Sequence, residues 1–114
     1  MLVKSKRLST RQFNEVMKKG RFAHSPLFML RILTNKKGTR IAAVAPQKIA
    51  KKAVTRNRIR RRMYEAVKPF MGSIVSDAWL IIFAKKDVSD TEFNELVMGM
   101  KILLDNSNLY YSRE

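Results

Sequence analysis

The stretch "TRNRIRRRMYEAV" at residues 55–67 places five arginines within seven positions and then turns apolar. Residues 52–68 around it contain neither glycine nor proline, which favours one uninterrupted helix. Pro69 disfavours helical geometry at Lys68, so the helix is expected to end there. When each residue is advanced by about 100°, the apolar side chains gather in one narrow stripe, which consists of Ile59, Met63, Ala66, Val67 and Phe70.

The remainder of this helix is cationic. Arginines stack one turn apart at positions 56 and 60 and again at 58 and 62, and each like-charged pair costs roughly 0.2–0.5 kcal/mol. Selection for stability alone would alternate the signs, whereas the planar fork of arginine suits phosphate oxygens. The residues predicted to bind nucleic acid, the cations through its phosphates, are Lys48, Lys51, Lys52, Arg56, Asn57, Arg58, Arg60, Arg61 and Arg62. Asn57 either contacts a base or backbone edge or caps a group locally.

The charge of the whole chain points the same way. It carries 24 basic against 9 acidic residues, a formal net charge of +15. Twenty of the basic residues lie in residues 1–68 with only two acids, whereas residues 69–114 hold four basic and seven acidic residues. This unevenness argues against a uniformly basic, inert surface. Nucleic acid is the first candidate partner, and a membrane surface or an acidic protein is the second.

Size and composition limit the other possibilities. A chain of 114 residues predicts a single domain over residues 1–114. It contains no cysteine, so it offers neither disulfides nor thiolate metal ligands. The longest apolar run, "AWLIIFA" at 78–84, is too short to span a membrane, and the N-terminus does not read as a signal peptide. A cytoplasmic protein is therefore expected.

Two capping boxes predict further helices. Ser9 and Gln12 have the spacing that starts a helix over residues 10–19, and Ser89 and Glu92 have the same spacing at the start of the last helix. The inner stripe predicted for that last helix is Phe93, Leu96, Val97, Met100, Leu103 and Leu104.

The remaining apolar segments predict strands. Residues 27–34 and 39–46 flank the turn signal "NKKG" (35–38), so they are expected to pair as a hairpin. Residues 78–84 follow a helix and can run parallel to 39–46, and a small strand is expected around 21–26. The predicted fold class is α+β: a two-layer sandwich of one mixed sheet, about four strands, and three helices, with the arginine-rich helix in a crossover connection.

No set of side chains predicts a protein-based catalytic centre. His24 is the only imidazole, and acid–base ribonuclease chemistry usually needs two complementary groups. Asp87, Asp90 and Glu92 are explained better by capping of the last helix than by a metal site. No catalytic residue and no metal ligand is therefore assigned to the protein.

The stretch "KIAKKAVTRNRIRR" (48–61) resembles the "RNR" signature of the bacterial ribonuclease P protein subunit. The resemblance extends to "RLSTRQFNEVMKKG" (7–20), which is similar to the opening helix of that family. It also includes "RIAAVAPQK" (40–48) before the signature and "AWLIIFAKK" (78–86) after it.

This resemblance implies an α/β sandwich whose arginine-rich helix lies in a left-handed crossover. It implies a protein that joins the catalytic ribonuclease P RNA, which removes the 5′ leader from precursor tRNA with Mg²⁺ ions that belong to the RNA. It also implies that the single-stranded leader lies in a cleft between the sheet and the first helix. The residues expected to form that cleft are Phe13, Met17, Phe28 and Arg31. Without the resemblance, Phe13 and Met17 read as ordinary packing of a helix on a sheet.

Two alternatives remain open at this point. A different RNA-binding structural protein, such as a ribosomal protein of similar fold, would need the basic helix but no cleft. A basic membrane-surface protein would need a broad apolar helix face, and the stripe on residues 52–68 is narrow and required for the core.

Overall fold

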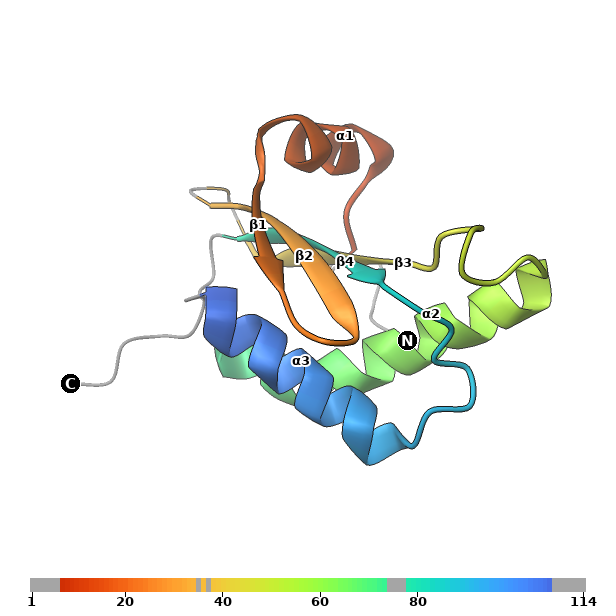
Figure 1. The fold of residues 1–114 in the computed structure, drawn as a ribbon. Coiled ribbons are helices and arrows are strands. Elements are labelled where there is room, and N and C mark those ends of the chain that lie inside the picture. Colours follow the sequence, from red (N-terminus) through yellow and green to blue (C-terminus); the bar gives the residue numbers. More distant parts are fainter. Residues whose placement is uncertain (1–6, 35, 37, 74–77, 108–114) are drawn as a thin grey trace.

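The computed structural model describes residues 7–34, 36, 38–73 and 78–107. The chain alternates helices and strands around a single sheet (Figure 1). In chain order the elements are α1 (Thr10–Lys19), β1 (Arg21–His24), β2 (Phe28–Leu33), β3 (Arg40–Val44), α2 (Ala53–Val67), the 3₁₀ helix η2 (Lys68–Ser73), β4 (Trp79–Ala84) and α3 (Phe93–Ser107). The α+β class and the crossover helix between two parallel strands are confirmed.

The strand order of the sheet is β1-β2-β4-β3. β2 pairs antiparallel with β1 and with β4, and β3 pairs with β4 in parallel, as predicted. The hairpin predicted for residues 27–34 and 39–46 is wrong, because β4 lies between β2 and β3. The turn signal at residues 35–38 therefore lies between two strands that do not pair with each other. Both pair with β4 instead.

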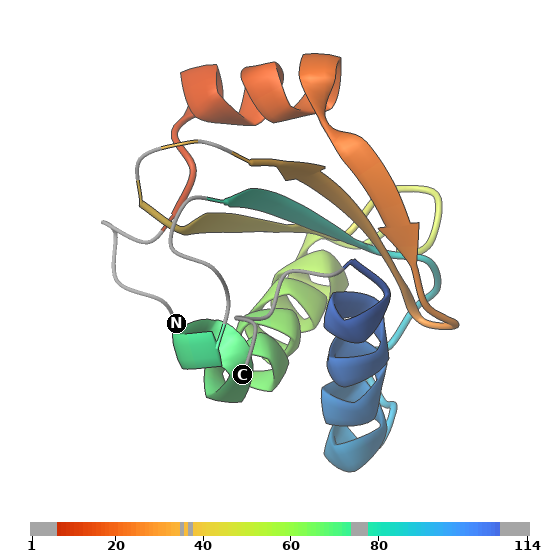
Figure 2. The same cartoon turned by 90° about the vertical axis from the view of Figure 1, so that its left-hand side faces the viewer.

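The helices lie on both faces of the sheet (Figure 2). α2 and α3 pack side by side against one face, while α1 crosses the other and contacts β2 and β4. The main core fills the space between the sheet and the α2–α3 layer. Its fully buried side chains include Leu30, Ile32, Ile41, Ile59, Met63, Leu80, Ile82, Leu96, Met100, Leu103 and Leu104. On the α1 side, Val16 and Ile81 are also fully buried but lie outside this cluster.

The arginine-rich helix is anchored by the predicted stripe. Ile59, Met63, Ala66 and Val67 are buried in α2, and Phe70 packs against the core from η2. The α-helix ends at Val67, one residue before the predicted end. The sequence did not identify Tyr64 as a core residue. Its side chain is buried, and its hydroxyl accepts a 3.1 Å hydrogen bond from the Ala43 N–H of β3.

The two predicted capping boxes have opposite outcomes. At α1 both bonds of the box are present: the Ser9 hydroxyl accepts from the Gln12 N–H, and the Gln12 side chain accepts from the Ser9 N–H. The box at Ser89 and Glu92 is wrong, because α3 begins at Phe93 and Ser89 lies in the turn before it. The backbone of Ser89 is used instead by arginines from α2.

Candidate nucleic-acid interface

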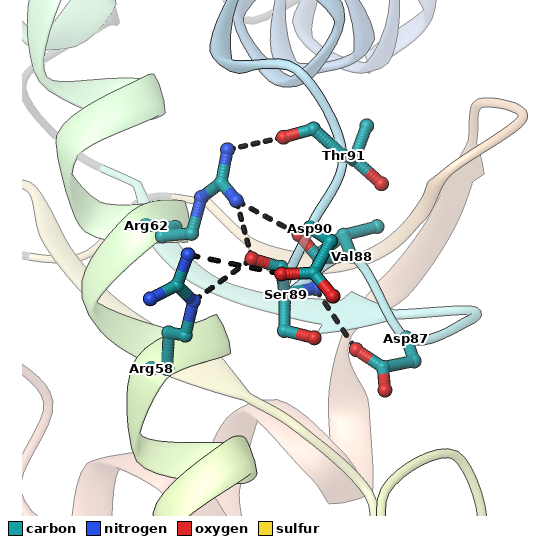
Figure 3. A network of polar contacts seen from close by, with 7 residues as sticks. All are labelled: Arg58, Arg62, Asp87, Val88, Ser89, Asp90 and Thr91. Atoms are coloured by element: carbon teal, nitrogen blue, oxygen red, sulfur yellow. Dashed lines mark hydrogen bonds and ion pairs between the residues drawn. The ribbon is translucent and has the colours of Figure 1, made fainter.

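Two arginines of α2 bind the turn between β4 and α3. The Arg58 Nε donates to the Ser89 carbonyl at 2.9 Å, and its guanidinium lies 3.9 Å from the Asp90 carboxylate. Arg62 donates to the carbonyls of Val88, Ser89 and Thr91. Figure 3 shows both side chains reaching from α2 to this turn. We call these contacts the turn clasp. Arg58 and Arg62 are thus engaged by backbone oxygens. The phosphate contact predicted for Arg58 stays a prediction, whereas for Arg62, held by three carbonyls, we expect the turn to be the partner instead of phosphate.

Arg56, Arg60 and Asn57 also have partners within the protein. Arg56 donates to the carbonyls of Ala50 and Lys51 at 3.0 and 2.7 Å, which fixes the chain that leads into α2. Arg60 donates to the Asn57 side chain. Asn57 therefore has a local side-chain partner, and its contact with a base or backbone edge stays a prediction.

The remaining predicted cations are directed to solvent. Lys48, Lys51, Lys52 and Arg61 are exposed. Within the described part of the chain, none of their side chains has a hydrogen-bond or ion-pair partner. They lie on the loop that enters α2 and on α2 itself. These four residues are the cations most available to a polyanion, and we call them the free cations.

A second surface lies on the side of the sheet that α1 crosses. Because side chains alternate along a strand, the sheet register places Phe22 beside Arg31 and Met29 beside His24 on this face. Phe83 and Val44 continue the row across the sheet. We call this surface, which consists of Phe22, His24, Met29, Arg31, Val44 and Phe83, the α1-side face.

Phe22 and Arg31 form the most distinctive contact of the α1-side face. The Arg31 guanidinium lies 4.2 Å from the centroid of the Phe22 ring and donates to the Gly20 carbonyl at 3.0 Å. Phe22 is 53% exposed, and its ring stacks on that of His24 with 6.2 Å between centroids. An exposed aromatic ring with a cation and an imidazole beside it suits the stacking of a base and the charge of its backbone. Neither Phe22 nor His24 was assigned to a site from the sequence. Their spacing of two residues in the small predicted strand could have indicated that both side chains lie on one face of the sheet.

The residues predicted for the leader cleft do not all reach this face. Arg31 does, Phe13 is half-buried on α1, and Met17 is 37% exposed there. Phe28 does not: it is fully buried, and its ring lies against Gly99 of α3, on the opposite side of the sheet. The prediction for Phe28 is wrong because side chains alternate between the two faces of a strand. Residues 28, 30 and 32 of β2 all face the main core, whereas 29, 31 and 33 face the other side.

The acidic residues before α3 are explained by local bonds. The hydroxyl and the backbone N–H of Ser89 hydrogen-bond to Asp87 and lower the pKa of its carboxyl. Asp87 therefore supports the turn and does not cap α3, contrary to the capping role predicted for this group. Among the residues that the structure describes, no group of three or more acidic, histidine or cysteine side chains could hold a metal ion.

Fold and site together define a small α+β protein with one surface of exposed cations and another that combines aromatic rings with arginine. A profile of the family described as Ribonuclease P matches residues 2–108. The chain therefore belongs to the ribonuclease P protein family, as the resemblance around the arginine-rich stretch implied.

Relatives of known name agree with this assignment. The chain is 30% identical over 109 residues to the "Ribonuclease P protein component" of Rippkaea orientalis, covering 90% of this chain and 86% of that protein. It is 34% identical over 94 residues to the protein of the same name from Finegoldia magna, covering 82% of each.

Solved structures of RNase P proteins have the same fold. The protein from Staphylococcus aureus matches with a TM-score of 0.79 at 21% identity, covering 95% of this chain and 100% of that one. The protein from Thermotoga maritima matches with a TM-score of 0.72 at 21% identity, covering 85% and 94%. At these identities the likeness establishes the fold.

Proposed function

We propose that this chain is the protein subunit of ribonuclease P, which binds the catalytic RNA and the 5′ leader of precursor tRNA and assists removal of the leader. Family membership supports the ribonuclease assignment. The finer division of labour is our proposal: the RNA subunit, with its Mg²⁺, performs the hydrolysis, and the protein supplies binding. No helix in the described part of the chain is long and apolar enough to cross a membrane. We propose a cytoplasmic location.

The observation that carries the proposal is the separation of two differently built surfaces. The free cations lie on α2 and the loop before it, where they suit the phosphates of a large RNA. The α1-side face carries Phe22, Arg31 and half-buried apolar side chains on the other side of the sheet, where they suit unstacked bases. One domain with both surfaces can contact a structured RNA and a single strand at once.

Reconstitution tests the proposal directly. The protein is added to a bacterial ribonuclease P RNA at low Mg²⁺, and cleavage of a precursor tRNA with a 5′ leader is followed. We expect cleavage at the mature 5′ end with both components and none with the protein alone. Binding of the RNA without stimulation of cleavage would instead favour a purely structural RNA-binding protein.

Arg61→Ala tests the free cations. Because Arg61 is exposed and has no partner among the described residues, its loss should remove about one phosphate contact. We expect weaker binding to ribonuclease P RNA and a slope of log affinity against log salt that is smaller by about one unit. Lys101→Ala is the matched control, since Lys101 is an exposed cation on α3 that pairs with Asp105. Equal slopes for wild type and Arg61→Ala would contradict this role.

Phe22→Ala tests the α1-side face. Phe22 is 53% exposed, so its removal disturbs the core less than removal of half-buried Phe13. With the catalytic RNA present, we expect Phe22→Ala to weaken the binding of precursor tRNA about tenfold. The affinity for mature tRNA should not change, because only the precursor carries the leader. Phe22→Tyr, which keeps a ring, should behave as wild type. An equal loss for both tRNAs would argue against leader contact.

A further inference from the structure

Between α2 and the start of α3 lies a shallow pocket that shares only Arg61 with the surfaces described above. Its lining consists of Arg58, Arg61, Arg62, Glu65 and Phe93. Three arginines and one glutamate give this lining a net positive charge. The pocket adjoins the turn clasp. Its lining residues belong to α2 and α3, which lie on the opposite face of the sheet from α1 (Figure 2).

Phe93 is the unexpected residue in this pocket. The sequence places it in the buried stripe of the last helix, but it is 42% exposed as the first residue of α3. Leu96, Met100, Leu103 and Leu104 of the same predicted stripe are fully buried. In the described part of the chain, cations lie over the rings of Phe22 and Trp79 but not over that of Phe93. Its ring is therefore an exposed apolar surface beside guanidinium groups, without a cation stacked on it.

The arginines of the pocket divide into fixed and free groups. Arg62 is held by three backbone carbonyls, and Arg58 by the Ser89 carbonyl, so their side chains form a pre-positioned wall. Arg61 is exposed and has no partner among the described residues. A wall that is already ordered loses little conformational entropy when a ligand enters, while a free guanidinium can take a bidentate grip on a phosphate.

We propose that this pocket binds one unpaired nucleotide of the ribonuclease P RNA, with the base stacked on Phe93 and the adjoining phosphate held by Arg61. The inference rests on the proposed function and deepens it by adding a base contact to a phosphate-binding helix. RNA is the ligand class because Phe93 provides a ring for stacking a base and Arg61 a charge for the adjoining phosphate in the same pocket. The catalytic RNA is the source because the pocket lies on the α2 side and not on the α1-side face.

The first experiment compares two substitutions at position 93 and one control. Phe93→Leu keeps an apolar side chain but removes the ring, and Phe93→Tyr keeps the ring. Met98→Leu is the matched control, since Met98 is 57% exposed on the same helix but outside the pocket. Dissociation constants for ribonuclease P RNA are measured over a series of salt concentrations, and thermal unfolding confirms that each variant is folded.

We expect Phe93→Leu to raise the dissociation constant about tenfold with an unchanged salt slope, because the ring carries no charge. Phe93→Tyr and Met98→Leu should retain wild-type affinity. If Phe93→Leu bound the RNA with wild-type affinity, the proposed stacking on Phe93 would be overturned. An equal loss of affinity in Phe93→Leu and Phe93→Tyr would also overturn it, because it would indicate a role in packing instead of stacking. Failure of the wild-type protein to bind the RNA would overturn the proposed function, and the pocket with it.

A spectroscopic measurement separates stacking from an indirect effect. Trp79 is the only tryptophan of the chain, so Phe93→Trp in a Trp79→Phe background reports on position 93 alone. We expect its emission to be quenched when ribonuclease P RNA is added and to recover at high salt as the complex dissociates. Binding of the RNA by this variant without a change of emission would overturn the base contact.

Discussion

Arg62→Ala is expected to lower the free energy of unfolding by about 2–4 kcal/mol while the salt slope of RNA binding stays at its wild-type value. Arg62 donates to the carbonyls of Val88, Ser89 and Thr91, and these partly buried bonds join α2 to the turn before α3. Removal of the guanidinium leaves those acceptors without their charged donor. In a domain of this size the midpoint of thermal unfolding should fall by roughly 10 °C.

Arg61→Ala is the matched control for this prediction, because Arg61 is the next residue toward the N-terminus but is exposed and unpartnered among the described residues. The two variants should show opposite patterns. Arg61→Ala is expected to change the salt slope and not the unfolding midpoint, and Arg62→Ala the midpoint and not the slope. A lower slope with an unchanged midpoint in Arg62→Ala would show that Arg62 faces phosphate instead of the turn.

Gly20→Ala is expected to lower the free energy of unfolding by about 1–3 kcal/mol and to reduce the preference for precursor over mature tRNA. A Cβ added at Gly20 would lie 2.5 Å from the Val16 carbonyl oxygen and 3.0 Å from that of Ile32. Both are backbone atoms, so the junction of α1 and β1 would have to open. Since Arg31 donates to the Gly20 carbonyl, this shift would also disturb the cation over Phe22.

Gly72→Ala is the matched control, because a Cβ at Gly72 would meet nothing within 4 Å. It should unfold at the wild-type temperature. The measurement is thermal unfolding followed by circular dichroism, together with the affinity ratio for the two tRNAs. Unfolding of Gly20→Ala at the wild-type temperature would mean that the junction relaxes without cost and that α1 is not tightly seated.

Much of the fold could be predicted where local chemistry decides it. The capping box at Ser9 and Gln12 fixes the start of α1, and the apolar stripe of Ile59 and Met63 fixes which side of α2 is buried. Strand partners could not be predicted so well. The turn signal between β2 and β3 suggested local pairing, but both strands pair with β4, which lies about forty residues further along the chain from β3. Long-range burial determined the order, and a turn motif carries no information about it.

The candidate site was predicted in part for the same reason. Exposure of Lys48, Lys51, Lys52 and Arg61 follows from charge and helical position. A helical wheel cannot show that Arg58 and Arg62 meet backbone carbonyls of a turn some thirty residues away. The turn that these arginines contact includes Ser89, so α3 begins at Phe93 and not directly after Ser89 as predicted. Phe93 is therefore the first residue of the helix, where it is exposed.

The central place of β4 bears on how the chain folds as it is synthesised. Until residues 79–84 leave the ribosome, β2 has only β1 as a neighbour and β3 has no partner among the other described strands. A two-stranded hairpin is marginal alone, and pairing between distant segments is slow. The arginine-rich helix is therefore made before the sheet on which it rests can close. β4, which joins β2 to β3, is synthesised late, so we expect the sheet to assemble in one cooperative step. A nascent chain that stops before Trp79 has the cations of α2 but no complete core to hold that helix in place.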